Sequence, residues 1–583
     1  MSEFVEYTVP IWRGLDMRQL KVDEAYIILK SFYNKVTYLY TLSDACNTCP
    51  YTKEKALQPN IHNETSFELN ANNVLKINTA HPYSFKLFEK DVGRYAFDNE
   101  SALSTYTQKI MEEFGVYNLT FYDNGTNTFE TDKKGVNVNF SLLSVFVLVG
   151  LILLVIKIAN CAWRTYRYEE TVRVAENAQS QSDEATVTAQ RRRMQSLDAF
   201  RGVAIVLMIF VNSGGGDYWW IEHAPWNGLH LADVVFPSFL WIMGVCIPIS
   251  VKSQMGRGVP KLKICLKIIE RSLKLFAIGL CLNSINGPNL EKLRVMGVLQ
   301  RFGIAYLVCG IVHTIFCKRD QILMPQVPWK RTLYDLILLR GEFITMLTLI
   351  AIYLGISFGL YVPNCPRGYL GPGGKHDNAA YVTCIGGATG YIDLQILGDS
   401  HIYQHPTAKY IYDSQAFDPE GLFGCLLTVV QVLFGVLAGV IILVHNAWYS
   451  RINRWLLWSI CLALLGGALC AFTKEDGLIP INKNLWSLSF VFVTSSLAFV
   501  MLSVFYFVID IKHWWTGFPF VEAGKNAIIM YVGHTIMHKM LPWHWRIGAM
   551  NTHFVLLLES VWNTLLWIAI ALYLNHKKFY YSL

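Results

Sequence analysis

Apolar runs of bilayer length recur through most of this 583-residue chain. A helix needs about 20 mainly apolar residues to cross the roughly 30 Å hydrocarbon core of a membrane. Eleven runs approach that length, and they predict an all-α polytopic membrane bundle of about eleven transmembrane helices. The runs are residues 140–161, 199–213, 231–251, 265–282, 295–316, 343–362, 422–445, 456–472, 485–509, 523–540 and 554–574.

The composition agrees with a membrane protein and excludes other classes. Hydrophobic residues make up 53% of the chain and charged residues 16%, whereas soluble domains carry about 25% charged residues. This balance excludes an ordinary soluble enzyme and a disordered protein. The net charge of +7 is small for the length and lies mostly in alternate loops, which is typical of membrane topology rather than of nucleic-acid binding.

Residues 1–139 differ from the rest, because they are polar and contain no run of bilayer length. Their β-branched and aromatic stretches predict a small β-rich domain. N-glycosylation acceptor triplets begin at Asn63, Asn99, Asn118 and Asn124. Four triplets within about 65 residues favour a lumenal or extracellular domain, against the alternative of coincidence in an Asn/Thr-rich stretch.

The distribution of Lys and Arg predicts the orientation. Loops 162–196, 252–274 and 317–342 are rich in both residues, whereas loop 214–228 has none and loop 363–420 has three. The positive-inside rule therefore predicts a lumenal N-terminus and a cytosolic C-terminus. Either a leader precedes this sequence or the first span carries the N-terminal domain across, because no basic segment followed by an apolar stretch opens the chain.

The chain then divides into four parts. Residues 1–139 form the predicted lumenal domain, 140–161 the first transmembrane helix, 162–196 a flexible cytosolic loop, and 197–583 a ten-helix transmembrane domain with a lumenal loop at 363–420. Four cysteines fall on the predicted oxidising side: Cys46, Cys49, Cys365 and Cys384. A Cys-x-x-Cys pair can be a zinc half-site or a redox motif, but no second half-site lies nearby, so disulfides are favoured.

Polar residues inside the apolar runs are the candidates for function. Asp198 and Arg201 lie three residues apart on one face at the cytosolic end of the second run, as either a helix-end ion pair or a ligand site. Asn212 follows about 16 Å further along the same helix, near its lumenal end. The glycines at 214–216 then break the helix and allow a close approach of the backbone.

His223 lies in the following short loop, among three tryptophans and without Lys or Arg. An imidazole can take up and return a proton, or act as a nucleophile. The alternative is a surface histidine with no function.

Further polar residues lie in later spans. Arg301 lies inside the fifth run, where a bare cation costs at least about 2.5 kcal/mol, so it should face a partner or an anionic ligand. Asn526 and His534 lie in the tenth run. His534 and His538 have the i, i+4 spacing of metal ligands but no third ligand accompanies them, so we predict bundle histidines and no metal site.

Lys267, Arg271 and Lys274 form a cationic stripe that enters the fourth run from the cytosol. This stripe suits a phosphate-bearing ligand, although topology alone would also produce it. The terminal residues 580–583, Tyr-Tyr-Ser-Leu, have the Tyr-x-x-bulky form that sorting adaptors of endosomes and lysosomes recognise.

Several chained motifs resemble the heparan-alpha-glucosaminide N-acetyltransferase family. They are Ser-Leu-Asp-Ala-Phe-Arg-Gly (196–202), Phe-Val-Asn-Ser-Gly-Gly-Gly (210–216), His-Ala-Pro-Trp-Asn-Gly-Leu (223–229), Ala-Asp-Val-Val-Phe-Pro-Ser-Phe-Leu-Trp-Ile-Met-Gly (232–244), Gly-Val-Leu-Gln-Arg (297–301), Asn-Cys-Pro-Arg-Gly-Tyr-Leu-Gly-Pro-Gly-Gly (364–374) and Gly-Lys-Asn (524–526). The resemblance covers about residues 140–583.

The resemblance implies a multi-pass lysosomal membrane enzyme with eleven spans. Such an enzyme uses cytosolic acetyl-CoA to N-acetylate the terminal glucosamine of heparan sulfate in the lumen, and residues 197–583 would be its catalytic domain. The family's active-site histidine falls on His223, and the companion asparagine falls on Asn212.

From this resemblance we expect His223 to act as nucleophile or general base, with Asn212 donating to the developing oxyanion. A direct reaction and one through an acetyl-enzyme remain open. The expected acetyl-CoA residues are Asp198, Arg201, Lys267, Arg271, Lys274, Arg301, Asn526 and His534, and the expected sugar residues are Trp226, Asn227 and Asp233.

Two other functions compete. Asn212, Arg301 and His534 would also suit a multi-pass transporter of a small anionic or sugar substrate, but no convincing pair of inverted repeats supports one. A cell-surface adhesion or receptor protein would explain the glycosylated domain and leave the intramembrane polar residues unexplained. The oligomeric state, including a homodimer, stays open.

Overall fold

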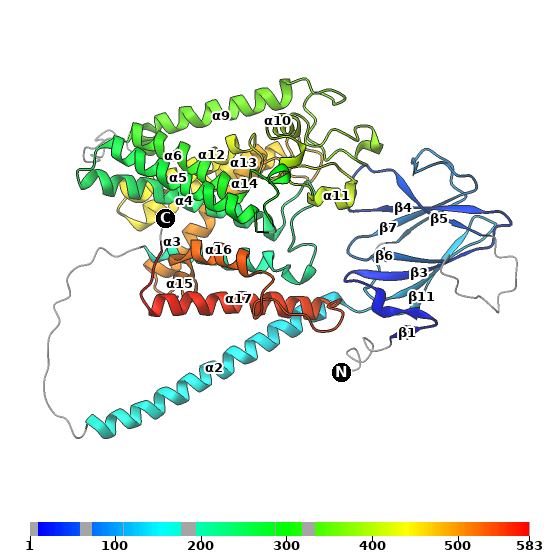
Figure 1. The fold of residues 1–583 in the computed structure, drawn as a ribbon, viewed down its shortest axis with the longest axis horizontal. Coiled ribbons are helices and arrows are strands. Elements are labelled where there is room, and N and C mark those ends of the chain that lie inside the picture. Colours follow the sequence, from blue (N-terminus) through cyan, green and yellow to red (C-terminus); the bar gives the residue numbers. More distant parts are fainter. Residues whose placement is uncertain are drawn as a thin grey trace.

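A β-rich N-terminal region packs against one end of a helical bundle (Figure 1). The computed structural model describes residues 10–58, 73–108, 110–175, 194–285, 287–317 and 333–581. The prediction of a polytopic helical membrane protein with a β-rich N-terminal domain is confirmed.

Two sheets make up most of the N-terminal region. One has the strand order β11 (Asn127–Lys133), β10 (Val116–Phe121), β3 (Glu24–Ser31), β6 (Val74–Asn78). The other has the order β8 (Tyr95–Ala96), β5 (Tyr51–Leu57), β4 (Thr37–Ser43), β7 (Tyr83–Phe88), β9 (Ser104–Gln108). A short hairpin of β1 (Ile11–Trp12) and β2 (Leu15–Asp16) precedes them.

The register of these strands follows the alternation of their side chains. β3 pairs parallel with β10 and antiparallel with β6. Ala25, Ile27 and Leu29 of β3 share one buried cluster with Leu39 and Phe85 of the other sheet, while the residues between them face the opposite side. A period of two therefore places the core between the two sheets.

The predicted apolar runs are helical. The long helices are α2 (Val138–Ala175), α3 (Gln195–Asn212), α4 (Leu231–Gly256), α5 (Lys261–Asn283), α6 (Val298–Phe316), α9 (Arg340–Gly359), α12 (Cys425–Val444), α13 (Trp448–Leu469), α14 (Leu488–Phe505, continued by a π-helical turn, Tyr506–Ile511) and α17 (His553–His576). Shorter helices are α8 (Tyr334–Leu338), α10 (Ala388–Leu397), α11 (Thr407–Tyr412), α15 (Phe520–Lys525) and α16 (Ala527–Met537).

Within the described ranges, nine helices are long and apolar enough to cross a membrane. Two of the eleven predicted spans, residues 265–282 and 523–540, are not among these nine helices. α5 carries the cationic stripe along its length, and the tenth run is divided at Asn526 between α15 and the 11-residue α16.

α2 extends beyond its predicted end at residue 161. It continues to Ala175 and so includes the start of the predicted flexible loop. The Arg and Glu residues of this segment have good helix propensity. Residues 176–193 of that loop lie outside the described ranges.

α12 lies at the centre of the bundle, and 89% of the residues in its apolar stretch are buried. It packs against α4, α6, α9 and α14. Gly244 of α4 faces Gly435 of α12, and a side chain at either position would collide with the backbone of the other helix. The two glycines therefore allow a close crossing of α4 and α12.

Polar contacts attach the β-rich region to the bundle. Arg94 pairs with Asp413 at 2.6 Å after α11, Thr48 donates to Asp377 at 3.2 Å, and His553 at the start of α17 lies 3.1 Å from Asp23. These contacts join the β-rich region to the loops between α9 and α12 and to the end of the bundle where α3 ends and α4 begins.

The cysteines predicted to be oxidised are paired as Cys46–Cys49 and Cys365–Cys384, each with a Cα–Cα distance of 5.6 Å. Among the glycosylation triplets, Asn99 and Asn124 are exposed, and Asn118 lies half-buried in β10. Asn63 lies outside the described residues.

Candidate active site

His223 lies in the loop that leads from α3 to α4. Gly214 and Gly216 have φ values of 95° and 77°, a conformation that side chains disfavour and glycine permits. These residues reverse the chain at the end of α3. The loop returns to the bundle at His230, which precedes the first residue of α4.

A buried carboxylate holds His223. Its Nδ1 donates to Oδ1 of Asp233 at 2.7 Å, and Asp233 is 1% exposed. The other oxygen, Oδ2, accepts the backbone N–H groups of Ala224 at 3.1 Å and His230 at 3.0 Å. Because an ionised carboxylate only accepts hydrogen bonds, the neutral imidazole carries its proton on Nδ1 and keeps a lone pair on Nε2.

Lys483 is the second partner of His223. Its Nζ lies 3.3 Å from Nε2 and 3.4 Å from Nδ1 of the imidazole. The loop before α14 supplies Lys483, and the adjacent Asn482 donates to Asn227 at 3.0 Å. The two loops are thereby joined beside the imidazole.

These surroundings lower the pKa of His223. Burial contributes most and the positive charge of Lys483 comes next, while Asp233 opposes both. The imidazole is therefore held neutral at a lower pH than an ordinary histidine.

Buried acidic and basic groups surround Lys483. Burial would raise the pKa of Glu420, but Lys483, Arg294 and Arg301 outweigh it and lower that pKa to about 2. Arg294 binds Glu420 at 2.6 Å and Asp418 at 2.5 Å. This network keeps a charged carboxylate among the cations beside the site.

Arg301 belongs to this network and not to a cavity wall. It is 1% exposed, its Nη2 donates to the carbonyl of Gly421 at 2.8 Å, and its guanidinium lies 4.9 Å from the centre of the Trp486 ring. The protein thus provides partners for Nη2 and for the face of the guanidinium, while Nε and Nη1 are buried without a hydrogen-bond partner among the described residues.

A cavity of about 310 Å³ opens between α3, α4, α5, α6 and α15–α16. Its wall follows α4 from Phe236 to Gln254, a rise of about 27 Å at 1.5 Å per residue. Phe236 is three residues from Asp233 along α4, so the cavity ends within one helical turn of the carboxylate that holds His223.

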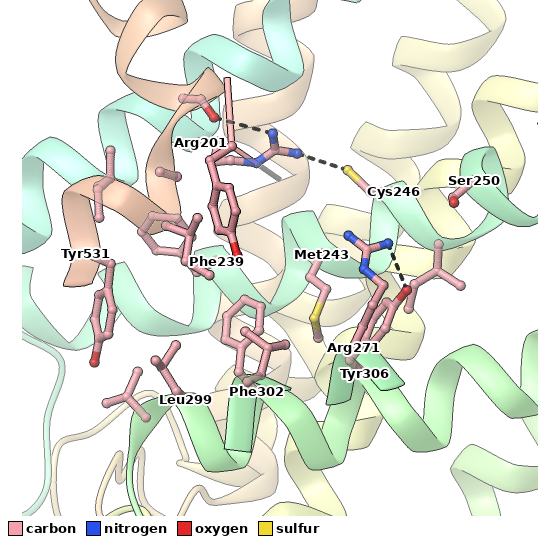
Figure 2. Close-up of a pocket in the computed structure, with 18 of the residues that line it drawn as sticks. Arg201, Phe239, Met243, Cys246, Ser250, Arg271, Leu299, Phe302, Tyr306 and Tyr531 are labelled. Atoms are coloured by element: carbon pink, nitrogen blue, oxygen red, sulfur yellow. Dashed lines mark hydrogen bonds between the residues drawn. The ribbon is translucent and has the colours of Figure 1, made fainter. Parts of the chain in front are cut away.

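Three cationic side chains line the cavity in the described part of the chain: Arg201, Arg271 and Lys525. Figure 2 shows Arg201 donating to Cys246, at 3.1 Å, and Arg271 donating to Tyr306, at 3.3 Å. Arg201 also pairs with Asp198 at 3.3 Å. Asp198 does not itself line the cavity but holds the side chain of Arg201, which does.

The other two members of the cationic stripe lie elsewhere. Lys267 is exposed on α5, and Lys274 is exposed and pairs with Glu270 at 2.6 Å. Of the three, Arg271 alone lines the cavity.

Asn526 fastens the C-terminal segment beside the cavity. It is fully buried, its Nδ2 donates to the carbonyl of Phe579 at 3.0 Å, and its Oδ1 accepts the N–H of Tyr581 at 3.1 Å. Tyr581 lines the cavity, and Tyr580 instead donates to Asn575 at 2.9 Å. The sequence pattern does not single out Tyr581, because residues 580–583 have the form of a sorting signal. Residues 582 and 583 lie outside the described residues.

The structure pairs Asn212 with His534. Nδ1 of His534 donates to the carbonyl of Met530 at 3.0 Å, so Nε2 is left to accept from Nδ2 of Asn212, also at 3.0 Å. Tyr531, which lines the cavity, packs edge-on against His534 with 5.5 Å between ring centres. This pair therefore lies beside the cavity, while His223 has its own partners.

Trp226 and Asn227 hold loops together. Trp226 is 2% exposed and donates to the carbonyl of Leu370 at 2.9 Å, and Asn227 donates to Glu475 at 2.6 Å. The residues with exposed rings in this loop are Trp219 and Trp220, at 45% and 40%.

Comparison with known proteins identifies the family. Residues 193–325, which include both His223 and Asp233, match the family model for the catalytic region of heparan-alpha-glucosaminide N-acetyltransferase. The human protein of that name is 42% identical over 397 residues, which are 67% of this chain and 60% of the relative. The mouse protein of that name is 38% identical over 506 residues, which are 81% of this chain and 77% of the relative.

The match to the human relative therefore spans less than two thirds of that protein's length. The match to the mouse relative is broader and includes most of both chains. The resemblance carried by the sequence motifs is confirmed, and the chain belongs to the heparan-alpha-glucosaminide N-acetyltransferase family.

Proposed function

We propose that this chain moves the acetyl group of cytosolic acetyl-CoA to the terminal non-reducing α-glucosamine of heparan sulfate in the lysosomal lumen. One observation carries the proposal. A cavity lined by cations runs along α4 and ends one helical turn from Asp233, the carboxylate that holds His223. The printed names of the human and mouse relatives support the same activity.

The cavity suits acetyl-CoA from one end to the other. Arg201, Arg271 and Lys525 would bind the phosphates of the nucleotide, since guanidinium and ammonium groups are the usual phosphate partners. The apolar wall formed by Phe239 and Phe302 suits the pantetheine arm. The positive-inside rule places the Gln254 end of α4 at the cytosol, where acetyl-CoA is available.

The thioester then lies toward the Phe236 end, near His223. Nε2 of His223 first removes a proton from the ammonium group of the sugar, and Asp233 stabilises the resulting imidazolium. The free amine then attacks the thioester carbonyl, the new N–C bond forms and the C–S bond breaks. The nitrogen loses its second proton to the leaving thiolate, so CoA departs as a thiol and the product is the neutral amide. Lys483 supplies an N–H group for the developing oxyanion. Asn212, expected in this role, instead donates to His534 beside the cavity.

We propose direct transfer with both substrates bound. The cavity approaches Asp233 to within one helical turn from the α4 side, whereas the exposed rings of Trp219 and Trp220 lie on the loop side. Neither substrate therefore needs to leave before the other enters. Acetyl-CoA alone should leave no acetyl group on His223, and a trapped acetyl-imidazole would contradict direct transfer.

The activity itself is tested in sealed vesicles that contain the full chain. Labelled acetyl-CoA is added on the cytosolic side and a glucosamine acceptor is enclosed on the lumenal side. We expect acetylated acceptor inside the vesicles. Uptake of a labelled substrate without acetylated product would instead support a transporter.

Location and processing follow the same proposal. We propose N-glycans at the exposed Asn99 and Asn124 and a lumenal N-terminal domain. The terminal segment from Tyr580 would serve as the lysosomal sorting signal. Since Tyr580 is bonded to Asn575, an adaptor would have to release this side chain in order to bind it.

Replacing Lys483 by methionine should move the acidic limb of the kcat/KM profile to higher pH. His223 must be neutral to accept a proton, so activity falls as the pH drops through its pKa. Lys483 lowers that pKa, so its removal raises the pKa and shifts the limb upward. The measurement is a pH profile with a glucosamine monosaccharide, and Lys409→Met, an exposed lysine on α11, is the control. An unmoved limb would contradict this role of Lys483.

Replacing Tyr581 by alanine should weaken CoA binding about fivefold, the order of magnitude expected for one aromatic contact. Tyr581 lines the cavity, whereas the adjacent Tyr580 bonds to Asn575. Tyr580 lies 5.8 Å from Lys525 of the cavity, so Tyr361→Ala, an exposed tyrosine just after α9, is the control instead. Calorimetry with CoA and the purified full chain measures both affinities, and equal affinities for the two variants would show that Tyr581 does not contact the donor.

A further inference from the structure

A row of aromatic and basic side chains leads away from His223 to the β-rich region. We call it the lumenal lane, and it consists of His230, Trp219, His81 and Lys474. The reaction proposed above needs only the terminal glucosamine. It gives none of these four residues a part in the chemistry, although the exposed ring of Trp219 marks the loop side of the site.

The near end of the lane begins at the carboxylate that holds His223. Oδ2 of Asp233 accepts the N–H of His230 at 3.0 Å, while Oδ1 accepts the imidazole of His223. The ring of His230 then packs edge-on against Trp219, with 5.5 Å between ring centres. The lane thus starts one side chain away from the reacting imidazole.

The far end belongs to the β-rich region. The ring of Trp219 lies 5.1 Å from that of His81, which precedes β7. Trp219 is 45% exposed. Exposed tryptophans also occur at the membrane interface, but a contact with the β-rich region turns this ring toward that region.

Lys474 supplies positive charge at the lane, and Glu475, 4.0 Å from its Nζ, balances part of that charge. The side chain of Lys474 is 58% exposed, and its Cε lies 3.4 Å from where a Cβ on Gly228 would stand. Burial lowers the pKa of His81, and Lys474 and His230 lower it further, while Asp44 and Asp23 oppose them. Lys474 therefore lies within electrostatic range of His81.

We infer that the lumenal lane is an acceptor subsite for an acidic oligosaccharide, binding the sugars that follow the terminal glucosamine. The inference rests on the proposed function. Flat aromatic faces pack against the apolar faces of sugar rings, the Lys ammonium group pairs with sulfate and carboxylate groups, and a neutral imidazole N–H donates to them. The β-rich region then supplies part of the acceptor site through His81.

The test compares acceptors of two lengths. The first is a glucosamine monosaccharide, and the second is a heparan-derived tetrasaccharide with a terminal glucosamine and sulfated uronate units. Binding of the fluorescent tetrasaccharide to the purified full chain is measured alongside kcat/KM for both acceptors. His81→Ala and Lys474→Ala are the variants, and His405→Ala, an exposed histidine between α10 and α11, is the control.

We expect each lane variant to bind the tetrasaccharide about fivefold more weakly, the effect of losing one hydrogen bond to an anionic sugar group. The KM for the monosaccharide should not change, and His405→Ala should behave as the wild type. Lys474→Ala changes an exposed residue, so it keeps the test valid if His81→Ala disturbs the contact between the β-rich region and the bundle.

Two results would overturn the lane. One is an equal loss with both acceptors, which would indicate a general structural effect, and the other is a wild-type chain that does not bind the tetrasaccharide. The proposed function fails separately. Absence of acetyl transfer by the wild type, with tetrasaccharide binding still dependent on His81 and Lys474, would refute the reaction and retain the lane.

Discussion

Replacing His223 by alanine should lower kcat for acetyl transfer by at least about 10³-fold, the scale of losing a general base that also orients the reacting groups. The imidazole is the group that Asp233 and Lys483 hold, and the cavity ends one helical turn from Asp233. The measurement is transfer from acetyl-CoA to a glucosamine monosaccharide by the purified full chain.

The variant should leave CoA binding intact, because His223 is not among the residues that line the cavity. CoA affinity therefore reports whether the variant is folded, and His405→Ala serves as a matched control on the same side of the protein. Wild-type turnover by a folded His223→Ala chain would exclude this imidazole from the chemistry.

The spans and the β-rich domain could be predicted because their signals are local. A run of about 20 apolar residues and a two-residue alternation each depend on neighbouring residues alone. His223 could be singled out for a similar reason, since a polar loop among tryptophans and glycines is visible in one short segment.

The partners of His223 could be predicted only in part, because some of them lie far from it in the sequence. Asp233 lies ten residues away, within reach of a sequence argument, and it was expected to bind the sugar. Lys483 lies 260 positions from His223, and Asn212 lies 322 positions from His534. Contacts at such separations are decided by how helices pack, which one sequence without an alignment does not specify.

The cationic stripe shows the same limit within a single helix. Lys267, Arg271 and Lys274 are spaced to share one face of α5, yet of the three only Arg271 lines the cavity. Tyr306 of α6 holds Arg271 at the cavity, because its hydroxyl lies 3.3 Å from the guanidinium and its ring makes a cation–π contact with the same group. Charge spacing predicted a phosphate site on α5, and packing decides which of the three residues faces the cavity.

Replacing Asp233 by asparagine should lower kcat by about 10³–10⁴-fold, the cost known for holding a catalytic histidine in the wrong tautomer. Oδ2 of Asp233 accepts two backbone N–H groups, from Ala224 and His230. The single oxygen of an asparagine would stay at that position, because its amide nitrogen cannot accept those bonds.

The amide nitrogen of the variant would then face Nδ1 of His223 in place of Oδ1. A donor at this point forces Nδ1 to accept, so the imidazole proton moves to Nε2 and the lone pair that should receive the substrate proton is lost. The two backbone bonds survive, so the loop and the start of α4 keep their geometry. The variant thus removes the correct tautomer and little else.

Three measurements separate this effect from a loss of structure. The kcat of Asp233→Asn should fall while its affinity for CoA stays at the wild-type value, and the ¹⁵N shifts of His223 should report a proton on Nε2. Asp399→Asn, an exposed residue of the loop after α10, should be neutral in all three. If Asp233→Asn keeps its kcat while the proton has moved to Nε2, His223 does not act as the base, and the direct transfer proposed here is refuted.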